Sequence, residues 1–406
     1  MDFQTCIAPN GIRLIHLKTQ RVAAYCTVLI NTGTRDEKKN EQGMAHFIEH
    51  VLFKGTQKRK SYHILTRMED VGGELDAFTT KEDTCVYATF LPIYIERAME
   101  LISDIVFHST FPAKEIEREK NVILDEINSY NDSPADLIYD DFEELIFDGH
   151  PLAKKILGSQ HSIQTFTTEL IHQFYKRTYN TDQIAVCTVG NMEFEKVFLL
   201  FNKYFAIIPA HKRTWKRTPF NTYMPREKVI IKNTHQAHCI IGTKAYSFKH
   251  KDRLLLHFLN NILGGSGANS RLNMALRERN GIVYYIESTY TPYSDSGIFC
   301  ISYATDKENM NNAMKLINLE MKKISETPLT HNQLSKAKKQ FYGQMAMSFE
   351  NHENLAINLA KSYLVYNQVD DLTTIAKEIE SIRADDLLRV ANDIFREEKR
   401  TIIKYV

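Results

Sequence analysis

The amino-acid sequence predicts an α+β protein made of two homologous domains, residues 1–208 and 226–406. Strand-like runs alternate with long amphipathic helical patterns along the chain. A proline-containing segment interrupts this alternation near the middle, and the halves on either side of it resemble each other. A length of 406 residues also favours more than one domain.

The elements of the first half can be placed from residue type and spacing. Strands are expected where β-branched and aromatic residues gather, at 12–16, 23–31, 74–79, 84–91 and 184–190. Helices are expected at 43–53, from an N-cap at Ser61 to the Gly72-Gly73 pair, and over most of 91–179. Strands and helices in this order favour a sheet covered by helices.

Residues 209–225 are expected to link the two domains. With their flanks, 207–226, they hold three prolines and five Lys or Arg residues. We interpret this basic run as a solvated connector and not as a binding patch.

An internal repeat relates the two halves. HFIEHVL, 46–52, matches HFLNNIL, 257–263, and the closing segments 167–186 and 384–403 match as well. The aligned polar residues are His46 with His257, Glu49 with Asn260, and His50 with Asn261. Because only the first copy keeps the His, Glu and His triplet, we expect the triplet to perform chemistry and not to be needed for folding.

Bulk composition argues against two classes of partner. The formal net charge is +1, so the chain as a whole has no strong electrostatic attraction for nucleic acid or anionic lipid. The sequence contains no run of 18 apolar residues, the length that a membrane-spanning helix needs. The N-terminus lacks the features of a secretory signal. Six scattered cysteines fit reduced core thiols. We therefore expect a cytoplasmic protein.

The triplet has the spacing of a metal site. On a helix, residues four apart share a face, so His46 and His50 can direct both imidazoles at one ion, and Glu49 can reach a water on it. The order H-x-x-E-H is that of zinc-peptidase motifs. Two histidines, one carboxylate and water would form an open, catalytic zinc site. The alternative is a helix with two satisfied histidines, which the apolar flanks disfavour.

The third ligand is expected in the helical segment 113–134. Glu119 and Glu126 are seven residues apart and share a face, and Glu126 lies among apolar residues. From the pattern alone, Asp125 and Glu117 are equally arguable.

With these residues in view, the chain resembles the pitrilysin-like zinc peptidases, or inverzincins, in a two-domain form like the insulinase and mitochondrial processing peptidase groups. GMAHFIEHVLFKGT, 43–56, resembles the family's zinc helix, and Glu126 and Glu119 stand where the family has its third ligand and a preceding glutamate. HPLAKKILG, 150–158, GGSG, 264–267, and SRLNMALRERNGIVYYI, 270–286, also match.

This resemblance implies two mostly antiparallel sheets flanked by helices, together half of a clamshell. It implies one zinc ion per chain, held by His46, His50 and Glu126. Nitrogen and oxygen ligands discriminate weakly between divalent metals, so the ligand types do not exclude manganese or cobalt. Glu49 would be the general base of a peptide-bond hydrolase. Glu119 would support the site without binding metal.

The resemblance also implies residues that meet the substrate. Arg277, from the second domain, would anchor it, and Tyr284 would stabilise the developing oxyanion. A substrate peptide would add as a strand beside 74–80, at Ala77, Phe78 and Thr79. At residue 76 this chain has Asp where the family often has Asn, which could alter subsite preference.

A two-domain chain would need a second chain to close a chamber. A homodimer is expected, with a heterodimer with a zinc-less homologue as the alternative. Two other functions compete with the endopeptidase: a non-catalytic partner or core subunit, which the intact triplet disfavours, and a zinc hydrolase of a non-peptide substrate.

Overall fold

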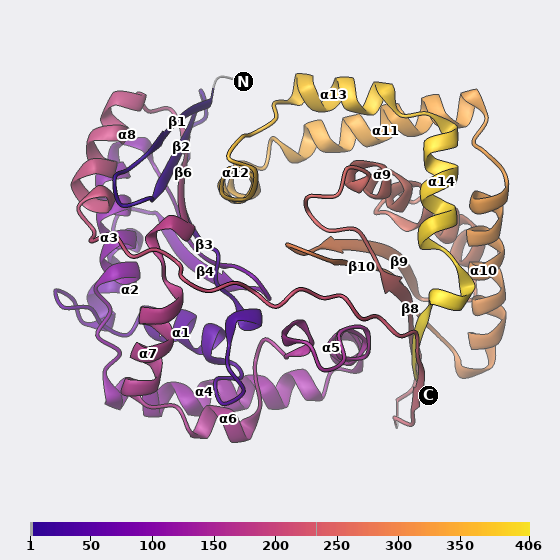
Figure 1. Ribbon diagram of the computed structural model, residues 1–406, viewed down its shortest axis with the longest axis horizontal. Coiled ribbons are helices and arrows are strands. Elements are labelled where there is room, and N and C mark those ends of the chain that lie inside the picture. Colours follow the sequence, from indigo (N-terminus) through magenta and orange to yellow (C-terminus); the bar gives the residue numbers. More distant parts are fainter. Residues whose placement is uncertain (1–2, 233) are drawn as a thin grey trace. The chain divides into compact units, whose positions relative to one another are not determined.

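The computed structural model describes residues 3–232 and 234–406. The chain forms two compact units, each built on one sheet (Figure 1). Unit 1 comprises Met1–Asn128, Lys154–Arg217 and Ala346–Thr373, and unit 2 comprises Ser129–Ala153, Thr218–Met345 and Thr374–Val406. Each unit therefore contains one segment from the opposite half of the sequence.

The two sheets share one strand order, which confirms the predicted duplicated α+β fold. In unit 1 the order is β1 (Phe3–Ile7), β2 (Arg13–Lys18), β6 (Ile184–Gly190), β3 (Ala24–Ile30), β5 (Thr84–Phe90) and β4 (Glu74–Thr79). In unit 2 the order is β7 (Glu227–Ile230), β11 (Thr401–Tyr405), β8 (Ala237–Lys244), β10 (Gly297–Thr305) and β9 (Tyr285–Pro292). Each sheet is antiparallel except for one parallel pair, β2 with β6 and β7 with β11. The first sheet differs by its additional edge strand, β1.

Helices cover both faces of the sheet in unit 1. Its helices are α1 (Met44–Leu52), α2 (Ser61–Glu69), α3 (Ile95–Phe107), α4 (Ala113–Asn131), α6 (Gln160–Gln164), α7 (Thr168–Thr178), α8 (Phe194–Phe201) and α12 (His352–Tyr366). The central strand β6 is apolar at nearly every position because it is buried on both sides. Ile184 and Val186 face the main core, whereas Ala185 and Cys187 face α12.

Unit 2 repeats this arrangement. Its helices are α5 (Pro134–Ile146), α9 (Arg253–Gly264), α10 (Met310–Glu326), α11 (His331–Ser348), α13 (Leu372–Ser381) and α14 (Ala384–Ile394), of which α11 and α13 cross the unit boundary by a few residues. One face of the sheet packs on a core that includes α9, α10 and α14. The other face packs on α5, which comes from the first half of the sequence. The two halves thus exchange one helix each.

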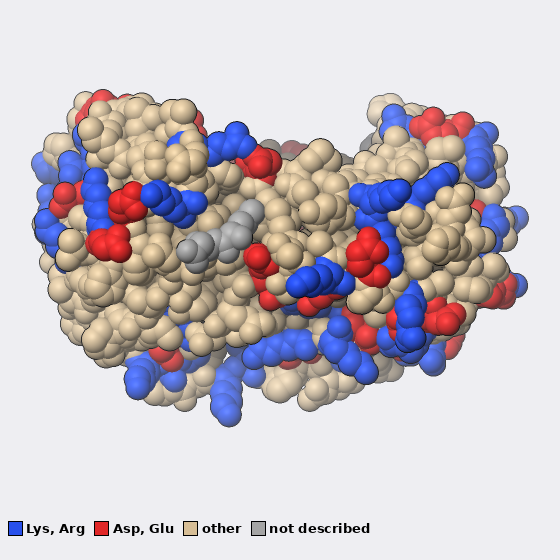
Figure 2. Space-filling view, turned by 90° about the horizontal axis from the view of Figure 1, so that it is seen from above, with Lys and Arg blue, Asp and Glu red and all other residues tan. Residues whose placement is uncertain are grey.

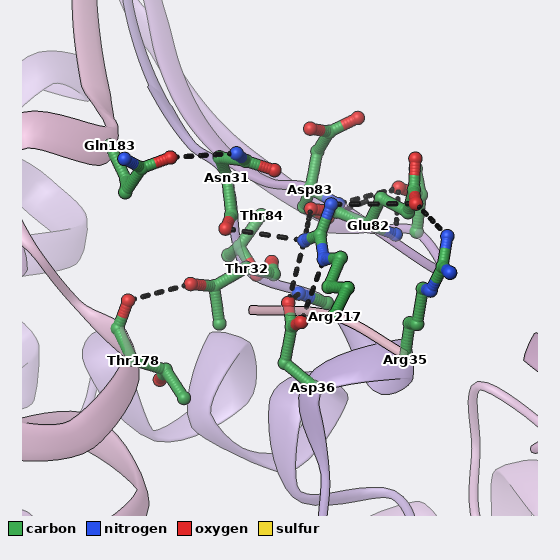
Figure 3. Close-up of polar contacts among 12 residues, drawn as sticks. Asn31, Thr32, Arg35, Asp36, Glu82, Asp83, Thr84, Thr178, Gln183 and Arg217 are labelled. Atoms are coloured by element: carbon green, nitrogen blue, oxygen red, sulfur yellow. Dashed lines mark hydrogen bonds and ion pairs between the residues drawn. The ribbon is translucent and has the colours of Figure 1, made fainter. Parts of the chain in front are cut away.

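The prediction that the connector is solvated is wrong in part. Residues 207–226 are irregular, as predicted, but Arg213 and Arg217 turn inward. Arg217 donates to both carboxylate oxygens of Asp36, at 2.8 and 2.7 Å, and lies 3.4 Å from Glu82 (Figure 3). Arg213 donates to the Asn31 carbonyl oxygen. Arg217 therefore belongs to unit 1, where it supplies a cation to the buried carboxylates of Asp36 and Glu82.

A smaller correction concerns Ser61, which is the first residue of α2, with Lys60 at the N-cap position. Figure 2 shows acidic and basic side chains interspersed on the face seen from above. Within the described ranges, no helix has both the length and the apolar character required to cross a membrane.

Candidate metal centre

Helix α1 carries the two histidines of the predicted site. His46 and His50 are one turn apart, and their ring centroids are 4.6 Å apart. His46 is buried and His50 is partly buried. Burial, reinforced by the charge of His50, lowers the pKa of His46 to about 3. His46 is therefore neutral at physiological pH, which is the form that binds a metal.

Helix α4 brings the carboxylate of Glu126 to both rings. Its oxygens lie 3.8 Å from His46 Nε2 and 3.7 Å from His50 Nε2. These separations are too long for hydrogen bonds but suit three ligands that share one ion. Candidate ligand atoms of the three residues lie within 4.8 Å of one another. The residues present therefore fit a zinc ion, and the structure brings Glu126 to the histidines.

The site is open on one side. The Glu126 side chain is 43% exposed, whereas that of His46 is 10% exposed. Two imidazoles and one carboxylate leave a coordination position for water or substrate.

Glu119 contacts His50 at Nδ1, the ring nitrogen that does not face Glu126. Its Oε1 lies 3.0 Å from His50 Nδ1, and its Oε2 lies 2.7 Å from Lys54 Nζ. Burial would lower the pKa of His50, but the hydrogen bond with Glu119 and the surrounding carboxylates outweigh it, so the pKa is raised. Burial would raise the pKa of Glu119, but His50 and Lys54 lower it overall. A carboxylate on the remote nitrogen fixes the ring's orientation and leaves Nε2 for the metal.

Glu49 also lies at this site, as the motif predicts. Its Oε2 is buried and has no hydrogen-bond partner among the described residues. Burial raises the pKa of Glu49. Thr79 and the charge of His50 act in the opposite direction without outweighing it, and Asp76 and Glu126 add to the increase. A carboxylate with a raised pKa suits a group that accepts and returns a proton.

Glu37, which the sequence analysis missed, anchors the start of α1. The helix begins after Gly43, which has no capping side chain. The buried carboxylate of Glu37 accepts hydrogen bonds from the Gly43 and Ala45 N–H groups, at 3.1 and 3.0 Å. Lys54 was missed too, although it lies four residues after His50 on the sequence. Charge spacing alone does not distinguish such residues from surface ones.

Two glycines let the chain approach α1 closely. Gly43 has φ +89° and Gly158, at the end of the HPLAKKILG stretch, has φ +75°. A Cβ added to Gly43 would lie 2.8 Å from the Gly158 Cα atom. The two positions thus exclude side chains on both sides of the contact.

The proposed substrate strand is at the edge of the sheet. β4 pairs with β5 on one side and ends the sheet's order on the other. It contains Ala77, Phe78 and Thr79, and it packs beside α1. An edge strand next to a metal helix has the geometry for strand addition, and the role of these three residues stays a prediction.

Arg277 and Tyr284 belong to unit 2. Arg277 is exposed at the end of a helical turn, and Tyr284 is 53% exposed and donates a hydrogen bond to Asp306 Oδ1 at 2.8 Å. Their predicted roles toward the substrate stay predictions.

Comparisons with known proteins agree with this geometry. Residues 14–160 match the family model described as insulinase (peptidase family M16), and residues 165–341 match the peptidase M16 inactive domain. The uncharacterized zinc protease YmxG of Bacillus subtilis is 30% identical over 392 residues, covering 96% of this chain and 95% of that protein. An uncharacterized zinc protease of Rickettsia felis is 29% identical, covering 97% and 95%.

Solved structures share the fold. A peptidase M16 inactive domain from Pseudomonas fluorescens superposes with a TM-score of 0.92 at 19% identity, covering 100% of this chain and 98% of that one. A protease from Helicobacter pylori gives 0.90 at 24% identity, covering 100% and 99%. The family models, the related zinc proteases and the convergent triplet lead to one conclusion: the chain belongs to the M16, or insulinase, family of peptidases.

Proposed function

We propose that the chain is a zinc-dependent endopeptidase that hydrolyses peptides or unfolded polypeptide segments. The observation that carries this proposal is the convergence of His46, His50 and Glu126, with an unpaired buried oxygen of Glu49 at the same site. The related zinc proteases support zinc as the ion, and we propose one ion per chain. A cytoplasmic location belongs to the same proposal.

Each side chain has a distinct role in this reaction. Bound zinc would lower the pKa of a water molecule and polarise the scissile carbonyl. Glu49 takes the proton of the attacking water and returns it to the leaving amine. Glu119 keeps His50 oriented through the 3.0 Å contact with Nδ1.

Substrate binding would involve elements outside the triplet. The free edge of β4 offers main-chain hydrogen bonds to an extended peptide, which makes recognition tolerant of side chains. Arg277 would anchor the substrate and Tyr284 would stabilise the oxyanion, within one chain or across a homodimer that encloses the peptide. A heterodimer with a zinc-less homologue is the alternative assembly.

Substitution of Glu49 tests the proposal directly. Glu49→Gln should retain zinc, measured by metal analysis, and cleave a quenched fluorogenic peptide roughly 10²- to 10⁴-fold more slowly. Glu69→Gln, an exposed glutamate of α2, is the matched control and should keep full activity. A fully active Glu49→Gln variant would refute the assigned role. A fully active monomer of 47.1 kDa in gel filtration would refute the enclosed dimer.

A further inference from the structure

A surface cavity of about 220 Å³, open to solvent, lies in unit 2. Its walls are the end of α9, the segment 269–271 and one side of α11. Its volume equals that of roughly seven water molecules in the liquid. The first half of the chain has charged side chains at the corresponding place in the repeat.

The repeat explains why this space exists. Aligning Pro134 with His352, the first residues of α5 and α12, pairs Glu119 with Ala337. Ala337 lines the cavity. A buried glutamate in one copy is thus replaced by a methyl group in the other.

The zinc-helix alignment agrees. It pairs His50 with Asn261, which also lines the cavity, and Lys54 with Gly265. The second copy therefore lacks the carboxylate and the ammonium group that fill this region in the first.

The cavity carries unpaired positive charge. Arg271 and Lys336 line it, and no Asp or Glu does so in the described part of the chain. Among the described residues, none forms a hydrogen bond or ion pair with the side chain of Arg271 or Lys336. Glu320 is the acidic group that acts on Arg271, and it is paired with Lys323 at 2.7 Å. A partly buried guanidinium without a partner favours an anionic ligand.

The other residues that line the cavity indicate a ligand with peptide and apolar groups as well as a negative charge. Amide side chains line one part, including Asn261 and Gln333, and these groups match the N–H and C=O groups of a peptide. Ile262, Leu329 and Ala337 form an apolar part that phosphate would leave unused. A carboxylate attached to a short apolar residue complements all three kinds of wall.

We propose that this cavity binds the terminal carboxylate of a short peptide. Arg271 and Lys336 pair with the carboxylate, the amides hold the adjoining peptide group, and the apolar wall receives the last side chain. The choice of a peptide carboxylate rests on the proposed peptidase function, since that reaction releases new C-termini.

Binding can be measured on the full chain after chelation of zinc, so that no cleavage occurs. By isothermal titration calorimetry, N-acetyl-alanyl-leucine should bind about tenfold more tightly than its C-terminal amide. Arg271→Gln and Lys336→Gln should each weaken binding of the acid about tenfold. Ala337→Glu restores the carboxylate of the first copy and should abolish binding.

Lys339→Gln, an exposed lysine of the same helix outside the cavity, is the control and should bind like the parent chain. Lys336 is also exposed, so Lys336→Gln should fold normally. It therefore tests the proposal even if Arg271→Gln disturbs folding. Equal binding of acid and amide, or unchanged binding in both variants, overturns the proposal. Displacement of the dipeptide by inorganic phosphate at equal concentration overturns the peptide assignment. A chain that binds the dipeptide but cleaves no peptide would refute only the peptidase function.

Discussion

Lys54 is connected to the candidate metal site through the carboxylate of Glu119. It lies 2.7 Å from Glu119, which contacts His50. Lys54→Met should leave Glu119 buried without its cation, raise the pKa of that carboxyl and loosen the orientation of His50. We expect zinc affinity, measured by competition with a chelator, to fall about tenfold.

Two further variants separate this effect from a general loss of charge. Lys54→Arg should recover most of the affinity because it restores the cation. Lys58→Met removes an exposed lysine nearby and should bind zinc normally. Unchanged zinc affinity in Lys54→Met would show that Glu119 does not depend on its partner.

His257, the counterpart of His46, makes the stability of unit 2 depend on pH. Burial, followed by the charge of Arg253, lowers its pKa to about 4 from 6.5. Between these values the unfolded chain binds the proton and the folded chain does not, so stability falls as pH falls from about 7 to 4. The loss over this range is on the order of 3 kcal/mol. His257→Gln should flatten this part of the curve of thermal midpoint against pH, and an unchanged slope would contradict the assignment.

The sequence pattern alone leads to part of the candidate metal site. His46, Glu49 and His50 follow from helical periodicity, because their spacing alone puts them on neighbouring faces. Glu126 does not follow in that way, because Asp125 and Glu117 fit the pattern equally well and only the family resemblance distinguishes Glu126 from them. Which carboxylate reaches the rings depends on how α4 packs against α1, and periodicity carries no information on that packing.

Gly43 and Gly158 are in close contact at the start of α1. A Cβ on Gly158 would lie 2.5 Å from the Gln42 carbonyl oxygen and 2.7 Å from the Gly43 Cα atom. Gly158→Ala should therefore displace the start of the helix, lower stability by about 2–3 kcal/mol and weaken zinc binding. Thermal unfolding and a zinc titration measure the two effects.

Gly149→Ala provides the matched control. Gly149 has nearly the same backbone angle, φ +72°, but nothing lies within 4 Å of its added Cβ. Gly149→Ala should lower the stability by about 1 kcal/mol, which is the cost of placing alanine in the left-handed backbone conformation. Its zinc affinity should be unchanged. Equal losses in both variants would show that backbone strain, and not the close contact, makes Gly158 necessary.

The positions of strands and helices along the sequence were predicted better than the elements against which they pack. β3, β4, β5 and β6 lie within one residue of the ranges expected from β-branched and aromatic runs. The exchange of α5 and α12 was not anticipated. An amphipathic helix shows that one face is buried, but its pattern is the same whichever sheet covers that face. The inward arginines of the connector were missed for a similar reason, because their carboxylate partners are distant in sequence.

The exchange makes each compact unit depend on both halves of the chain. α12 packs on β2, β3 and β6 with a stripe of residues spaced along one helical face. The stripe consists of Leu355, Ala356, Leu359, Ala360 and Tyr363. Each large apolar side chain buried there contributes about 1.5–3 kcal/mol. A unit that lacks this helix exposes one face of its sheet to water.

A chain ending at Arg217 tests this dependence. It keeps every strand of the first sheet but lacks α12, so we expect it to aggregate or to bind a hydrophobic dye, and to bind zinc poorly. Fusing residues 346–373 to its C-terminus through a flexible linker should restore a soluble, zinc-binding unit. The same fusion with Leu355→Asp and Leu359→Asp should not, because charges cannot be buried against the sheet. A monomeric 1–217 fragment that melts at the temperature of the full chain would show that the first half folds without the exchanged helix.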